Sequence, residues 1–175
     1  MVKTIVVLLG FLLTLAAGIL ALLITIGPRY GIGSFSIPVP TFSFSLYGGL
    51  FETVPIGNWL LQAFILILIS SLVLIRGIIG LSLLFKQEFL NLLVGVSVLF
   101  TEPLYFSRGI GHFSDIGLLP PTFFSVGSVL TGYHNFLYNS QDIHFMNGVL
   151  SLGATWLVIE IILFVLTRFK RFRHI

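Results

Sequence analysis

The chain has 175 residues, of which 57% are hydrophobic and only 9% are charged, and its mean hydropathy is +1.10. Ordinary soluble domains carry about 25% charged residues, so this composition excludes a water-soluble globular protein and indicates an integral membrane protein. Most of the net charge of +3 comes from the end of the chain, beside an apolar segment. Cations in that position orient a chain in the bilayer and bind lipid headgroups, so we expect no nucleic-acid partner.

The first predicted element is an unbroken apolar run at 5-26, between Lys3 and Gly27-Pro28-Arg29. A signal peptide has an apolar core of about 7–15 residues before a small-residue cleavage site. The triplet Ala16-Ala17-Gly18 resembles such a site, but the apolar run continues beyond it. We therefore expect a retained transmembrane span over a cleaved signal.

The first long loop, 28-57, alternates apolar and small polar residues over 34–40 and 42–46. Period-two alternation is typical of strands, and Pro38 and Pro40 restrict such a strand to a sheet edge. Two interpretations stay open. The loop forms one or two short strands on the outer membrane surface, or its aromatic side chains dip into the interface without pairing.

Two further spans are predicted at 58-79 and 89-106, the first opened by Trp59 as an interface anchor. The connection Lys86-Gln87-Glu88 is short enough to place the two helices side by side and antiparallel. A spanning helix needs about 17–25 residues, so the span at 89-106 is near the short limit.

The second long loop covers 107-146, and the fourth span is predicted at 147-167. Pro120-Pro121 forbids a continuous helix through this loop. Its many apolar side chains predict that it packs on the first loop or lies half-immersed as a re-entrant segment.

These elements predict an all-α membrane protein, a four-transmembrane-helix bundle in one domain with two long outward loops, the first partly β-stranded. Cations mark one side at Lys3, Arg76, Lys86, Arg168, Lys170, Arg171 and Arg173. Only Arg29 and Arg108 mark the other side. The excess of cations on cytoplasmic segments predicts a cell-membrane protein with both termini cytoplasmic, whose last four cations contact lipid headgroups.

The costliest side chain is Glu160, because an ionised group at the centre of a spanning helix costs about 2.5–3.5 kcal/mol on insertion scales. Arg76 is the cation that belongs to a span interior. At about 1.5 Å of rise per residue, Glu160 lies about 20 Å and Arg76 about 27 Å along their helices. We predict contact between them. The pair locks two helices together or moves protons or cations; otherwise Glu160 faces a partner subunit or is protonated.

The outward loops contain a scattered set of metal-ligand types: His112, Asp115, His134, Asp142 and His144. Imidazole and carboxylate groups can hold zinc or copper. The alternative is that the histidines are exposed or bond to loop backbone, which the wide spacing and the absence of an HExxH motif favour. We therefore predict no cofactor, with a metal ion, or a haem held by two of the histidines, as the alternative. The absence of cysteine removes thiolate metal sites, disulfides and iron–sulfur clusters.

The segment Tyr47-Gly48-Gly49-Leu50-Phe51, in a strand-like outer loop, resembles the claudin plan, which has a Gly-Leu-Trp motif followed by two cysteines. Phe51 stands in place of the tryptophan and the cysteines are missing. The resemblance covers five residues and a shared topology, and it implies a surface or adhesion protein.

Four functions follow as hypotheses. The first is an accessory or structural subunit of a larger membrane complex, for example a respiratory one, without catalytic activity of its own. It rests on small size, missing cofactor motifs, Gly and Ser helix faces, and apolar loops that indicate other membrane subunits or a second copy as partners. The second is a transporter or channel component using Glu160, Arg76, Gln62 and Asn91. The third is a redox or metal-binding subunit, and the fourth the adhesion protein.

Overall fold

The computed structural model describes residues 2–31, 33–42, 51–85, 87–106, 116–138 and 140–171. Its long helices are α1 (Val2–Tyr30), α2 (Ile56–Leu84), α3 (Glu88–Phe106) and α6 (Phe145–Arg171). Within the described residues three segments are long and apolar enough to cross a membrane: Thr4–Arg29, Ile56–Leu84 and Phe145–Arg168. The predicted, mostly helical membrane architecture is confirmed to that extent.

The third predicted span is a different case. Helix α3 has 19 residues, but its apolar stretch, Glu88–Thr101, is shorter than the other three. Pro103 falls within its last turns. A bundle of four spanning helices is therefore not established by helix length and composition.

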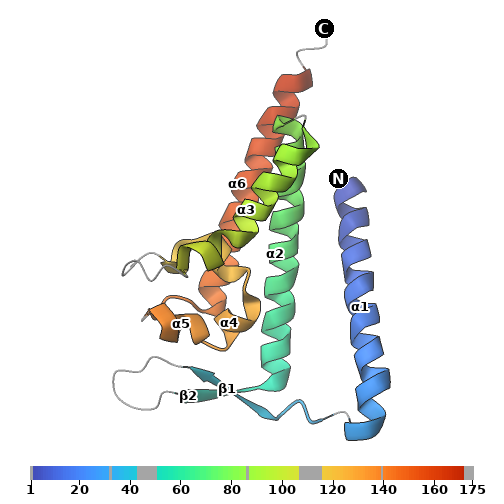
Figure 1. Ribbon diagram of the computed structural model, residues 1–175, viewed down its shortest axis with the longest axis vertical. Helices are drawn as coiled ribbons and strands as arrows, with labels where there is room; N and C mark the ends of the chain where they lie inside the picture. Colours follow the sequence, from blue (N-terminus) through green and yellow to red (C-terminus); the bar gives the residue numbers. More distant parts are fainter. Residues whose placement is uncertain are drawn as a thin grey trace.

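Helices α2 and α6 form the centre of the molecule, with α3 returning beside them and α1 standing on the other side of α2 (Figure 1). Every third or fourth residue of α2 is buried from Ala63 to Val73, which is the spacing of one helix face. These helices share one hydrophobic core with the loop between α3 and α6. Its buried residues are Ala63, Leu66, Val73, Phe123, Val129, Leu130, Ile143 and Leu152.

The loop between α1 and α2 forms a two-stranded antiparallel sheet, β1 (Pro38–Phe42) and β2 (Phe51–Pro55), with Val39 opposite Val54. The prediction of strands in this loop is confirmed. The strand that pairs with β1 is β2, and the alternating stretch 42–46 lies, apart from Phe42, outside the described residues. A two-stranded sheet has only edges, so the prolines of β1 remove no hydrogen bond from a central strand.

The described part of the loop between α3 and α6 folds into short helices: η1 (Ile116–Leu118), η2 (Pro120–Phe123), α4 (Val126–Leu130) and α5 (Tyr133–Tyr138). We call residues 116–138 the outer segment. It packs on the first loop, where the Phe42 amide donates to the Thr131 carbonyl at 2.7 Å and the Phe42 and Phe136 rings stack 5.6 Å apart. It also packs between the long helices, where Phe123 is fully buried.

Two glycines make this packing possible. Gly132 has a φ of +71°, and a Cβ there would overlap the Phe42 carbonyl of β1. Gly148 of α6 faces Phe123 and Leu66, and a Cβ there would lie 2.8 Å from the Phe123 ring. The outer segment therefore approaches the sheet and α6 more closely than any larger residue allows.

Candidate functional site

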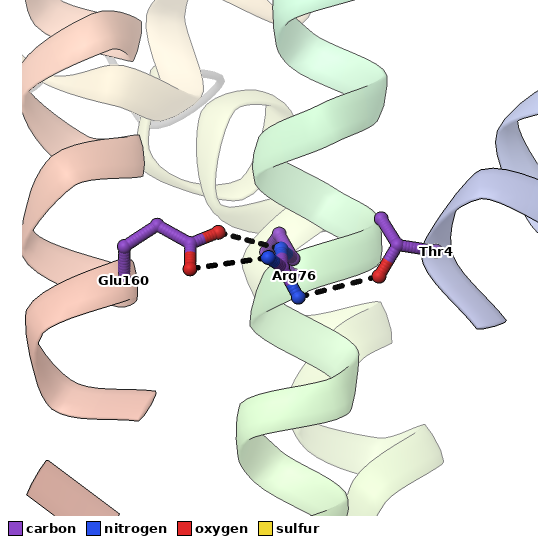
Figure 2. A network of polar contacts seen from close by, with 3 residues as sticks. All are labelled: Thr4, Arg76 and Glu160. Carbon is purple, nitrogen blue, oxygen red and sulfur yellow. Dashed lines mark hydrogen bonds and ion pairs between the residues drawn. The ribbon is translucent and has the colours of Figure 1, made fainter. Parts of the chain in front are cut away.

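The polar centre of the helical core joins three helices through Arg76 of α2 (Figure 2). Arg76 Nε lies 2.5 Å from Glu160 Oε1 of α6, and Arg76 Nη2 donates to Glu160 Oε2 at 3.1 Å. Arg76 Nη1 donates to the hydroxyl of Thr4 in α1 at 3.3 Å. The guanidinium thus contacts both carboxylate oxygens of α6 and also donates a hydrogen bond to α1.

Small residues of α2 bring this pair within reach. A Cβ at Gly77 would lie 3.9 Å from Ile159, and one at Gly80 would lie 3.6 Å from Leu163. Gly77 directly follows Arg76 and Gly80 lies four residues after it, and both let α6 approach α2 closely. The two helices therefore place Arg76 and Glu160 opposite each other at the same level (Figure 2).

The pair is shielded from the surroundings. The side chain of Arg76 is 14% exposed and that of Glu160 is 29% exposed, while Thr4 is buried. A planar guanidinium that binds a carboxylate through two parallel contacts fixes orientation as well as distance. The geometry is that of a helix–helix clamp, with both charges engaged.

Thr4 was not expected from the sequence as part of this site. Its hydroxyl sits one residue after Lys3, in an otherwise apolar run, and no spacing links it to residues more than seventy positions away. Only the three-dimensional placement of α1 beside α2 reveals it.

The described histidines and acids of the second loop form no metal-binding group. Among the described residues, no group of three or more His, Asp or Glu side chains could hold a metal ion. His134 is buried in α5, with its ring 5.7 Å from that of Tyr138. Asp142 and His144 are exposed before the start of α6, and His112 and Asp115 lie outside the described residues.

The cationic end of α6 is described in part. Arg168 is exposed and its guanidinium carbon lies 5.7 Å from the centre of the Phe164 ring. Lys170 and Arg171 continue the helix, and Arg173 lies outside the described residues. Residues 47–50 of the claudin-like segment also lie outside.

The residues suggested for a polar transport route are separated. Asn91 lines an apolar groove between α2 and α3, and the described residues of that groove do not include Arg76, Glu160 or Gln62. Gln62 lies 14 residues before Arg76 on α2, a rise of about 21 Å. Gln62 is therefore not in the neighbourhood of the ion pair.

Comparison with known protein families, curated proteins and solved structures finds no match for this chain.

Proposed function

We propose that this chain is a multi-pass membrane protein in which α1, α2, α3 and α6 all cross the bilayer of the cell membrane, with both termini cytoplasmic. The excess of cations at the C-terminal end of α6 and in the α2–α3 connection supports this orientation. Trp59, near the start of α2, supports an outer interface at that level, since tryptophan favours membrane interfaces.

This placement fixes the depth of α2 residues in the hydrocarbon core of the membrane. A hydrocarbon core of about 30 Å takes about 20 residues of helix, so the core that begins at Trp59 ends near Gly80. Arg76 then lies about 5 Å inside the inner edge, within reach of headgroups by snorkelling. Leu66 lies about 10 Å below the outer edge, and its neighbour Phe123 carries the outer segment to that depth.

The same placement accounts for the short apolar stretch of α3. Helix α3 packs against η2 of the outer segment. If the outer segment is re-entrant, α3 meets it inside the membrane, and the third crossing needs fewer apolar residues than a helix exposed to lipid over its whole length. The crossing is then shared between α3 and the outer segment.

Within this topology we infer an accessory, structural role: the chain contributes helices to a larger membrane assembly and carries no catalytic activity of its own. The observation that carries this inference is the surface of α1. From Ile5 to Ile26, all side chains are exposed except those of Leu8, Leu12 and Leu15, which are half-buried. These three, with buried Thr4, mark the side toward α2.

A second side of α1 has the form of a docking surface. We call Gly10, Thr14, Ala17 and Ala21 the small-residue face; their spacing of three and four residues places them on one side of the helix. The Thr14 hydroxyl donates to the Gly10 carbonyl at 2.9 Å, so its polar group is satisfied within α1. Small residues let another membrane helix approach closely, and this side points away from α2.

The clamp supports a structural role over transport. Both oxygens of Glu160 face Arg76, and Arg76 also holds Thr4. A carboxylate that must release and accept protons or cations needs to leave its partner in each cycle. The contacts of Arg76 instead connect three helices and favour a rigid core. The side of α1 that faces away from α2 stays available to a partner.

Gentle detergent extraction from native membranes, followed by mass spectrometry of the co-purifying proteins, tests this function. We expect companions in a fixed ratio to the chain. A chain that emerges alone, or only with itself, would contradict the accessory role, and liposome flux with and without Glu160→Gln would then test transport.

A pair of adjacent substitutions sharpens the test. Ala17→Leu adds bulk to the small-residue face, whereas Ala16→Leu adds the same bulk about 100° away on the same helix. We expect Ala17→Leu to reduce the companions recovered and Ala16→Leu to leave them unchanged. Equal recovery from both variants would show that this face is not the contact.

A further inference from the structure

An apolar groove runs between α2 and α3 and has a volume of about 650 Å³. It exists because glycines face it from both helices. A Cβ at Gly95 of α3 would meet nothing within 4 Å, and a Cβ at Gly77 of α2 would meet only Ile159, at 3.9 Å. The missing side chains leave an open space between α2 and α3 over part of their length.

The two ends of the groove differ in chemistry. At the α2–α3 connection it is lined by Ser82, Glu88 and Asn91, whereas its far end is lined by Pro120, Pro121 and Phe124. The side-chain oxygen of Asn91 is buried and accepts no hydrogen bond from the described residues, while its amide nitrogen donates weakly to Phe85, at 3.4 Å. The Glu88 side chain is exposed at the same end.

The length of the groove matches one leaflet of a bilayer. On α2 it extends from Val73 to Ser82, a rise of about 14 Å. Half of a typical hydrocarbon core is about 15 Å. On the proposed placement, Ser82 lies at the level of the inner headgroups and Val73 lies about 10 Å inside the inner edge of the hydrocarbon core.

From these observations we propose that the groove binds one acyl chain of an inner-leaflet phospholipid whose headgroup carries an ammonium group, as in phosphatidylethanolamine. The apolar walls accommodate the chain, and η2 lines the far end of the groove. The oxygens of Glu88 and Asn91 accept hydrogen bonds from the ammonium, which neither the choline headgroup nor an anionic glycerol headgroup can supply as a charged donor. The inference rests on the proposed membrane placement and does not require partner subunits.

Native mass spectrometry of the purified full chain tests the site. The chain is titrated in detergent with phosphatidylethanolamine, phosphatidylcholine and phosphatidylglycerol that have identical acyl chains. We expect the ethanolamine lipid to bind about tenfold more tightly than the other two, the factor expected from one charge-assisted hydrogen bond. Equal binding of all three lipids to the wild-type chain would overturn the headgroup assignment.

Two variants separate chain binding from headgroup recognition. Gly95→Leu fills the groove and should abolish the bound lipid, whereas Gly153→Leu, at a second glycine with open space around it, should not. The double change Glu88→Gln with Asn91→Leu should keep a bound lipid and lose the preference among headgroups. This second readout does not depend on whether Gly95→Leu folds.

Other occupants give different results. A dimer of the chain that Gly95→Leu dissociates would overturn the proposal in favour of a second copy. Lipid binding unaffected by Gly95→Leu would place the lipid elsewhere. Because the measurement uses the isolated chain, retained lipid with no companions after native extraction would contradict the accessory role and leave the groove assignment intact.

Discussion

At the scale of single residues, the most consequential feature is the clamp that Arg76 forms with Glu160 and Thr4. A charge left without its partner in this environment is more costly than the pair, because neither lipid nor apolar side chains can solvate it. The clamp is therefore expected to behave as a unit whose members depend on one another.

A double-mutant cycle of Arg76→Met and Glu160→Met measures this dependence. Each single change should lower the free energy of unfolding by about 1–3 kcal/mol, between values for polar contacts in membranes and for buried ion pairs in soluble proteins. The double variant should be more stable than the sum of the two losses allows, by more than about 0.5 kcal/mol. Unfolding in mixed micelles is the measurement; strict additivity would show that the two side chains do not interact.

Gly132 is the second decisive residue, because its φ of +71° and the nearby Phe42 carbonyl both exclude a side chain. We expect Gly132→Ala to destabilise the outer segment by about 1–3 kcal/mol, the usual cost of a strained backbone position. Gly127→Ala is the matched control, since Gly127 is helical with nothing within 4 Å of its Cβ position. Limited proteolysis of the outer segment should accelerate only for Gly132→Ala; equal rates would contradict the strain.

At the scale of elements, the outer segment is fixed by its contact with α6. Phe123 of η2 is fully buried against Gly148, and Leu66 of α2 lies on the same side. Three elements, η2, α2 and α6, therefore pack closely around Phe123.

We expect Gly148→Ala to lower thermal stability by about 1–3 kcal/mol, because the added methyl would overlap the Phe123 ring and overpacking carries a cost of this size. Gly153→Ala, five residues further along α6, adds the same methyl into open space and raises helix propensity, so it should be neutral or slightly stabilising. Thermal denaturation of both variants in the same detergent tests this; identical melting temperatures would mean that η2 does not pack on Gly148.

The sequence predicts the long elements well, for physical reasons. Apolar runs longer than a bilayer leave few alternatives to helices, and α1, α2 and α6 extend a few residues beyond the predicted spans at each end. Proline-interrupted alternation correctly indicated strands in 28-57. The pairing of β1 with β2 was not predicted, because alternation alone does not determine which segments pair.

The packing of the outer segment was harder to predict. Its apolar residues indicated burial, but Phe123 acquires its place only through the glycine at position 148, on another element. Likewise, one acid and one cation in apolar helices suggested the Arg76–Glu160 contact, whereas Thr4 carried no signal. The sequence suggests an ion pair between two charged residues in apolar helices, because each charge is costly without a partner. It does not suggest an uncharged partner such as Thr4, which only the packing of the helices brings close.

At the scale of the whole molecule, the absence of cysteine makes topology directly measurable. Single cysteines at Ser36, before β1, and at Gln87, between α2 and α3, are both at exposed positions. We expect a membrane-impermeant maleimide to label Ser36→Cys on intact cells and Gln87→Cys only after permeabilisation. The reverse pattern would invert the proposed orientation, and labelling of both on intact cells would contradict a membrane-spanning α2.

The central claim is that α1 presents its small-residue face to another membrane protein, and photo-crosslinking in native membranes tests it most directly. A photoreactive residue at Ala21 lies on that face, and one at Leu15 points toward α2. The account predicts one discrete adduct with a different protein from Ala21, and only crosslinks within the chain from Leu15. If Ala21 yields lipid adducts alone, or adducts only with a second copy of the chain, the accessory role is contradicted.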